Sequence, residues 1–187
     1  MDIVKHGLKF AAVGGLLYLL GVYLIHLGGL DFTSISEWWF RGILVFFVIL
    51  SIVLRKGSNN GYLSFLEGFK IGMITTAFLA IFIAISTWLY CDYLNPMYTD
   101  NYEQQYRTMH YEKMMRRYIA ETWNRDTITP GAIDTIQRGL DLNINNHVGY
   151  LFTTGGQVQS NFLYSFFWGI MISFTVALLA RNVKEEV

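Results

Sequence analysis

Apolar residues along the chain gather in four long runs, three in its first half and one near its end. Each run is about as long as the ~20 apolar residues that a helix needs to cross a ~30 Å hydrocarbon core. A mostly polar stretch separates the third run from the fourth. The pattern predicts an all-α, polytopic membrane protein with transmembrane helices near residues 8–27, 36–54, 66–92 and 160–180, and a helical insert between the third and fourth.

Local signals give the boundaries of these parts. Ser34 and Ser64 each stand three residues before a glutamate, Glu37 and Glu67, which is the capping-box pattern of a helix start. Asn95-Pro96 is expected to end the third helix. We therefore predict three spans within residues 1–95, an insert at 96–158, and a fourth span with a cytoplasmic tail at 159–187.

Basic residues predict the orientation of the spans, because short loops that carry Lys and Arg stay in the cytoplasm. The segment 28–36 has no Lys or Arg and carries Asp31. We expect both termini in the cytoplasm and the insert on the opposite side. We also expect the first span to persist, because it is longer than a signal-peptide core and no A-x-A-like site follows it. The basic residues beside the spans fall on one side: Lys5, Lys9, Arg55, Lys56, Lys70, Arg181 and Lys184.

Small residues form a stripe along the first span. Glycines recur there every seven residues, which is close to two helical turns, and such a stripe lets another helix approach closely in lipid. The stripe predicts either packing against the other spans, which we favour, or a docking face for a partner or a second copy. Its residues are Gly7, Ala11, Gly14, Gly21 and Gly28, with Gly15 extending a small-residue ladder from Gly7 and Ala11.

The insert is predicted to be a helical hairpin. Residues 97–125 have helical amphipathic spacing, and Thr129-Pro130 suits the start of a second, shorter helix. A hairpin of this size cannot hold a sizeable core by itself, so it caps the spans, lies on the membrane or contacts a partner. The candidate partner surface is one face of the longer helix: Tyr111, Met114, Met115, Tyr118 and Trp123.

Ionisable residues near the outer ends of the spans form the candidate polar site. His26, Arg41 and Asp92 all lie near that end in the predicted topology. Ionisable residues within spans are functional candidates by default, although capping and snorkelling account for many of them. Hydroxyl residues deeper in the spans usually bond to their own helix.

Composition further limits the classes of function that we expect for the chain. Charged residues make up 15% of the chain and the formal net charge is zero, so we expect no nucleic-acid partner. The one cysteine, Cys91, is expected to be a packing residue, and we predict no cofactor and no metal site. Hydrolase and phosphate-loop motifs are absent. His110 and His147 in the insert leave a metal-dependent enzyme as the least favoured alternative.

The segment from Gly61 to Gly72, which reads GYLSFLEGFKIG, resembles the entry to the third span of domain-of-unknown-function family 4199. That family consists of small four-span membrane proteins of Bacteroidetes. The Asn95-Pro96 stop, the amphipathic helix and the basic end of the last span are also similar to the family. The resemblance implies a four-span fold in the bacterial inner membrane, and it transfers no functional residue. Together with the orientation expected from the basic residues, this location predicts residues 96–158 in the periplasm.

These observations favour a non-enzymatic inner-membrane protein that serves as an accessory or scaffold subunit. Its partners would be the lipid bilayer and other membrane subunits or itself. The alternative is a small transporter or lipid-binding protein with a polar site at His26, Arg41 and Asp92.

Overall fold

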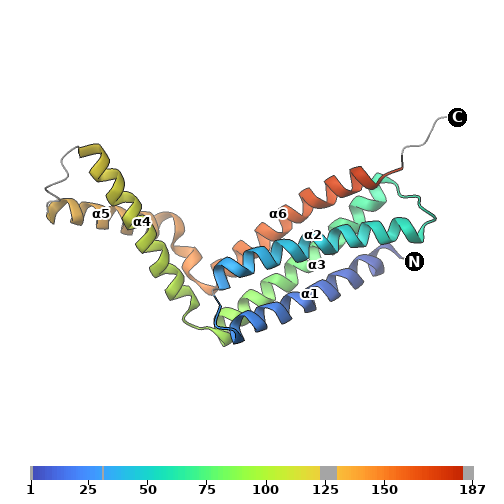
Figure 1. Cartoon of the computed structure of the whole chain (residues 1–187), viewed down its shortest axis with the longest axis horizontal. Coiled ribbons are helices and arrows are strands. Elements are labelled where there is room, and N and C mark those ends of the chain that lie inside the picture. Colours follow the sequence, from blue (N-terminus) through green and yellow to red (C-terminus); the bar gives the residue numbers. More distant parts are fainter. Residues whose placement is uncertain (1, 31, 123–129, 183–187) are drawn as a thin grey trace. The chain divides into compact units, whose positions relative to one another are not determined.

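The computed structural model describes residues 2–30, 32–122 and 130–182 (Figure 1). Within these residues the regular elements are helices, without a strand, as predicted. The α-helices are α1 (Ile3–Leu27), α2 (Phe32–Ser58), α3 (Phe65–Leu89), α4 (Tyr98–Thr122), α5 (Pro130–Asn143) and α6 (Thr154–Ala180). A π-helical turn, Tyr90–Leu94, continues α3, and the turns Ile144–Val148 and Gly149–Phe152 connect α5 to α6.

The chain forms two compact units. The first contains Met1–Tyr90 and Val158–Val187, and therefore α1, α2, α3 and most of α6. The second contains Cys91–Gln157, and therefore α4 and α5.

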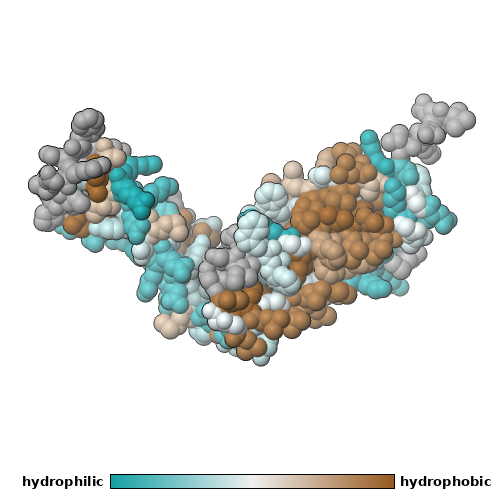
Figure 2. All heavy atoms as spheres, in the orientation of Figure 1, coloured by the Kyte–Doolittle hydropathy of each residue, from teal (hydrophilic) through white to brown (hydrophobic). Residues whose placement is uncertain are grey.

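Four helices of the described chain are long and apolar enough to cross a membrane, which confirms the predicted spans. They are Ile3–Leu27, Trp38–Ser58, Phe65–Leu94 and Thr154–Ala180. Figure 2 shows hydrophobic residues over much of the visible face of the first unit, whereas the second unit is largely hydrophilic in this view. Large apolar side chains such as Leu16, Phe46 and Phe167 are exposed at the surface of the first unit, as lipid contact requires.

Capping groups extend the helices beyond the apolar runs. Asp2 accepts a hydrogen bond from the backbone nitrogen of Val4, so α1 begins several residues before the expected start near residue 8. At α3, Ser64 Oγ accepts from Glu67 N at 3.2 Å, which is half of the predicted capping box. The Glu67 carboxylate instead pairs with Arg55 at 2.7 Å. The side chains of Ser34 and Glu37 lie outside the described part of the structure.

Hydrogen bonds fasten the α2–α3 turn to the end of α6. Lys56 Nζ donates to the carbonyl oxygen of Ala180 at 2.9 Å. Leu63 N donates to Asn182 Oδ1 at 2.9 Å, and Asn182 N donates to the Leu63 carbonyl at 3.0 Å. These contacts place Arg55, Lys56 and the C-terminal end of α6 at one end of the first unit.

Glycines bring α1 close to α2 and α3. A Cβ atom at Gly14 would lie 2.9 Å from Leu79 of α3 and 2.9 Å from Phe47 of α2. At Gly7 it would lie 2.7 Å from Ile74 Cγ2, and at Gly15 it would meet the Phe82 ring. Bare backbone at these positions gives the helices dispersion contacts that larger residues would prevent.

The second unit has its own small core. Ile136 and Leu140 of α5 and Ile144 of the turn after it are buried, four residues apart along the chain. Met114 of α4 reaches this core beside Gly139, where a Cβ would lie 3.3 Å from the methionine Cε. Phe152 in the last turn contacts the rings of Tyr102 and Tyr106 of α4, with ring centres 5.9 and 5.3 Å away. The aromatic contacts close the hairpin.

Gly15→Leu should lower the midpoint of thermal unfolding in detergent, because its side chain would collide with Phe82 of α3. Overpacking of this kind costs about 1–3 kcal/mol. Gly42→Leu is the matched control, since nothing lies within 4 Å of a Cβ at Gly42 and both changes place a better helix former inside a helix. Circular dichroism melts would compare them, and equal midpoints would contradict the packing described above.

Candidate functional site

Arg41 lies between two aromatic rings near the start of the second span. Its guanidinium carbon is 5.5 Å from the centre of the Trp38 ring, one turn earlier on α2, and 5.7 Å from the Tyr164 ring of α6. Both distances fall within the ~6 Å range of a cation–π contact. The guanidinium of this half-buried arginine therefore contacts aromatic rings of both α2 and α6.

The other two residues of the expected polar site have different partners. The His26 ring on α1 meets the Tyr90 ring edge-on, with 6.1 Å between centres. Asp92 belongs to the second unit, where its Oδ1 accepts a hydrogen bond from Thr154 Oγ1 at 2.8 Å. Each of the three predicted residues is thus held by its own local contact.

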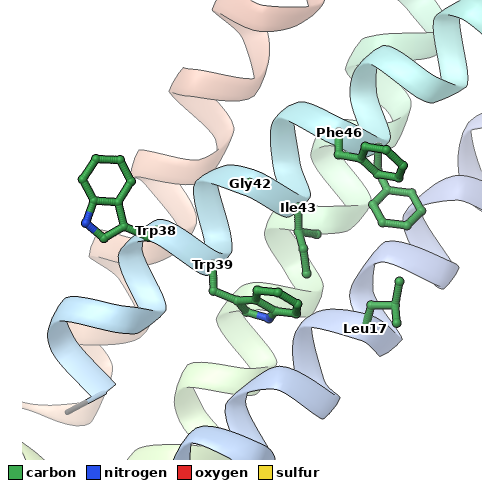
Figure 3. A pocket seen from close by; sticks show the side chains of 7 residues that line it. Leu17, Trp38, Trp39, Gly42, Ile43 and Phe46 are labelled. Carbon is green, nitrogen blue, oxygen red and sulfur yellow. The ribbon is translucent and has the colours of Figure 1, made fainter. Parts of the chain in front are cut away.

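An apolar groove runs along α1 and α2 (Figure 3). Its volume is about 290 Å³. In Figure 3, Trp39 and Ile43 of α2 and Leu17 of α1 point into the space between the two helices. Gly42 leaves the α2 backbone bare within the groove, with nothing within 4 Å of the position of a Cβ. The lining residues are Leu17, Trp38, Trp39, Gly42, Ile43, Phe46 and Phe47.

The small-residue stripe of α1 is occupied from within the chain. Gly7, Ala11, Gly14 and Gly21 are buried, whereas Gly28 at the end of the helix is exposed. At Gly21 a Cβ would meet the indole of Trp39, so this glycine gives the tryptophan its position at the groove. The buried part of the stripe thus serves the bundle itself, which is the alternative that the sequence favoured.

His6 is a buried residue that the sequence pattern did not single out. Its side chain is 4% exposed, and Nε2 lies 2.8 Å from the carbonyl oxygen of Ser51. Because a carbonyl only accepts, Nε2 carries the proton and donates it. Thr75 Oγ1 of α3 donates to Ser51 Oγ at 3.2 Å, so the hydrogen bonds join α1, α2 and α3. His6 lies directly before Gly7, the first residue of the stripe, and this position is the sequence signal that could have identified it.

The predicted partner face of the insert lies partly within the hairpin. Tyr111, Met114, Met115 and Tyr118 are half-buried on α4, and Trp123 lies outside the described residues. An open depression crosses from α4 to α5 beside this face, lined by Arg107, Thr108, Tyr111, Gln137, Leu140 and Asp141.

Arg107 connects the two helices of the hairpin at this depression. Its Nη1 lies 2.6 Å from Asp141 Oδ1 of α5, and its Nε lies 2.7 Å from Glu103 Oε1 of α4. The hydrogen bonds that Arg107 donates, first to Asp141 and then to Glu103, raise the pKa of its guanidinium above its usual value. The charge is therefore permanent, and the ion pairs combine with Tyr111 and Leu140 to give the depression polar and apolar sides.

His110 and His147 would be the metal ligands in the least favoured alternative, a metal-dependent enzyme. His110 stacks on Tyr106 of its own helix, 3.8 Å between ring centres, and its Nδ1 lies 3.1 Å from the Tyr106 carbonyl oxygen. The His147 side chain is outside the described part. Among the side chains that are described, no group of three His, Cys, Asp or Glu residues could hold a metal ion.

Comparison with known proteins identifies the family. The sequence model of the family described as protein of unknown function (DUF4199) matches residues 9–182. The chain belongs to this family. The match covers most of α1, all of α2, α3 and α6, and the second unit, so the family's sequence model includes the insert. No curated protein and no solved structure matches the chain.

His6→Ala should lower the unfolding midpoint of the protein in detergent, because it removes the donor to Ser51 and leaves a cavity. Hydrogen bonds between membrane helices contribute about 0.6–2 kcal/mol. Lys5→Ala, at the exposed neighbouring position, is the control and should leave the midpoint unchanged. If His6→Ala had the same unfolding midpoint as the wild type, this hydrogen bond would not stabilise the packing of α1.

Proposed function

We propose that this integral membrane protein is a non-enzymatic accessory or scaffold subunit of a larger inner-membrane complex, and that its second unit carries the contact surface. The observation that supports this proposal best is the depression beside Arg107. It lies on a separate compact unit and combines a fixed guanidinium, a tyrosine and an apolar side chain. Arginine and tyrosine are enriched at protein interfaces and among the residues that contribute most to binding.

The proposal includes an orientation in the membrane. We assign the end of the first unit that carries Arg55, Lys56 and Arg181 to the cytoplasm, and the second unit to the periplasm. Contacts among the α2–α3 turn and the end of α6 gather these basic residues at one end, and Lys and Arg favour the cytoplasmic side. This orientation would present the depression beside Arg107 to other envelope proteins.

Cysteine labelling would test the orientation, because Cys91 is the one natural cysteine and can be replaced by alanine. Met109→Cys, at an exposed position of α4, should react with a membrane-impermeant maleimide in intact spheroplasts. Gly57→Cys, in the exposed last turn of α2, should react only after lysis. The reverse pattern of labelling would overturn the assignment.

Photo-crosslinking would test the contact surface in native membranes. A benzoylphenylalanine at Thr108, in the depression, should give a discrete crosslinked product whose second protein is identified by mass spectrometry. A product of twice the chain mass would identify a second copy. The same probe at Lys113 is the control, since five residues further along α4 it points about 140° away around the helix. A monomer without crosslinks at either position, also monomeric in lipid nanodiscs, would contradict the scaffold role.

A further inference from the structure

We propose that His6 is a pH-sensitive switch, and that protonation of its ring releases the start of α1 from α2 and α3. This inference goes beyond the scaffold role and does not depend on it, because it assigns a pH response to the membrane-spanning unit rather than a partner to the insert. It rests on the burial of His6, on the hydrogen bonds at its two ring nitrogens and on the charges around it.

One ring nitrogen of His6 joins α1 to its neighbours. Nε2 donates to the carbonyl oxygen of Ser51, 2.8 Å away, and the side chain is 4% exposed. Thr75 of α3 completes the contact, because its Oγ1 lies 3.2 Å from Ser51 Oγ and 3.4 Å from the carbonyl oxygen of Gly7. Three helices therefore meet at His6, about 4.5 Å along α1 from its first residue, Ile3.

The second ring nitrogen of His6 lacks a comparable contact. Nδ1 is buried and has no hydrogen-bond partner among the described residues. Phe10, one turn further along α1, packs its ring against the imidazole with 4.9 Å between the centres. His110 of the insert differs, since its Nδ1 lies 3.1 Å from the carbonyl oxygen of Tyr106. A proton on His6 Nδ1 would be a buried donor without an acceptor, and such a donor shifts an equilibrium about tenfold or more.

The charges around His6 oppose a second proton on its ring. On the described parts of the three helices that meet there, the nearest charged residues are five cations and two carboxylates. Both carboxylates are engaged: Asp2 accepts from the backbone nitrogen of Val4. Glu67 pairs with Arg55 at 2.7 Å. Like charges disfavour the protonated imidazole. These seven residues are Asp2, Lys5 and Lys9 at the start of α1, Arg55 and Lys56 of α2, and Glu67 and Lys70 of α3.

The ring can take up a second proton more easily once the start of α1 has moved away from α2 and α3. Released, it reaches the aqueous surface at which the exposed Lys5 and Lys9 lie, where both ring nitrogens can donate to water. The released state thus binds more protons than the packed state, so the packing is strongest at high pH and weakens as the pH falls. Imidazole ordinarily changes charge between about pH 5 and pH 8, which is the range in which the switch should respond.

Unfolding of the full-length protein by sodium dodecyl sulfate in mixed micelles would test the proposal at about pH 8 and about pH 5. The unfolding constant of the wild type should rise about tenfold at the lower pH. His6→Gln, whose amide can donate to the Ser51 carbonyl but takes up no proton, should lose this rise. His26→Gln, at the half-buried histidine near the other end of α1, is the matched control and should keep it.

Spin labels would locate the change. Val4→Cys in α1 and Val53→Cys in α2 lie at exposed positions, each two residues from one partner of the hydrogen bond between His6 and Ser51, and Cys91→Ala removes the natural cysteine. In lipid nanodiscs the distance between the two labels should gain a longer component at about pH 5, and should not do so when His6→Gln is added.

The proposal would be overturned if neither the unfolding constant nor the label distance of the protein with His6 changed between the two pH values. A pH response that His6→Gln retains would overturn it as well, because another group would then be responsible. The first of these outcomes is measured on the protein that carries His6, so it decides even where His6→Gln does not fold.

Discussion

The close approach of α1 to α2 and α3 is the constraint on which the membrane-spanning unit depends. In lipid, helices gain little by burying leucines against one another, so they associate where small residues allow close packing. Gly14 admits Leu79 and Phe47, and Gly21 admits the Trp39 indole. The same packing that joins the helices therefore also sets the position of a groove wall. Architecture and candidate site have one physical origin.

The sequence could predict the parts of the fold that depend on local chemistry. Four apolar runs, the Ser64 cap and the helix start at Pro130 follow from residues close together in the chain. The ionic partner of Glu67 could not be predicted in the same way. Arg55 and Lys70 are both near it in sequence, and the packing of α2 against α3 decides in favour of Arg55. The π-helical turn at Tyr90–Leu94 likewise had no signal that we recognised.

The candidate site was predictable in its residue types and less so in its contacts. Arg41 was expected near the outer interface because it is a charge at the start of a span. Its contact with Tyr164 depends on the packing of α6, which lies more than one hundred residues later in the chain. The groove has a weak local signal, a glycine flanked at four residues on either side by Trp38 and Phe46. That spacing indicates a groove only when α1 is known to form its other wall.

The polar contact between α3 and α6 has a consequence for the order in which the helices of the bundle assemble. Thr76 Oγ1 lies 3.3 Å from Ser173 Oγ, and a Cβ at Gly72 would lie 2.6 Å from the same hydroxyl. The second unit, Cys91–Gln157, is translated between these two helices. At about 5–20 residues per second its 67 residues take about 3–13 s. During that interval the face of α3 that carries Gly72 and Thr76 has no α6 to pack against. The bundle can be completed only after the second unit has been synthesised.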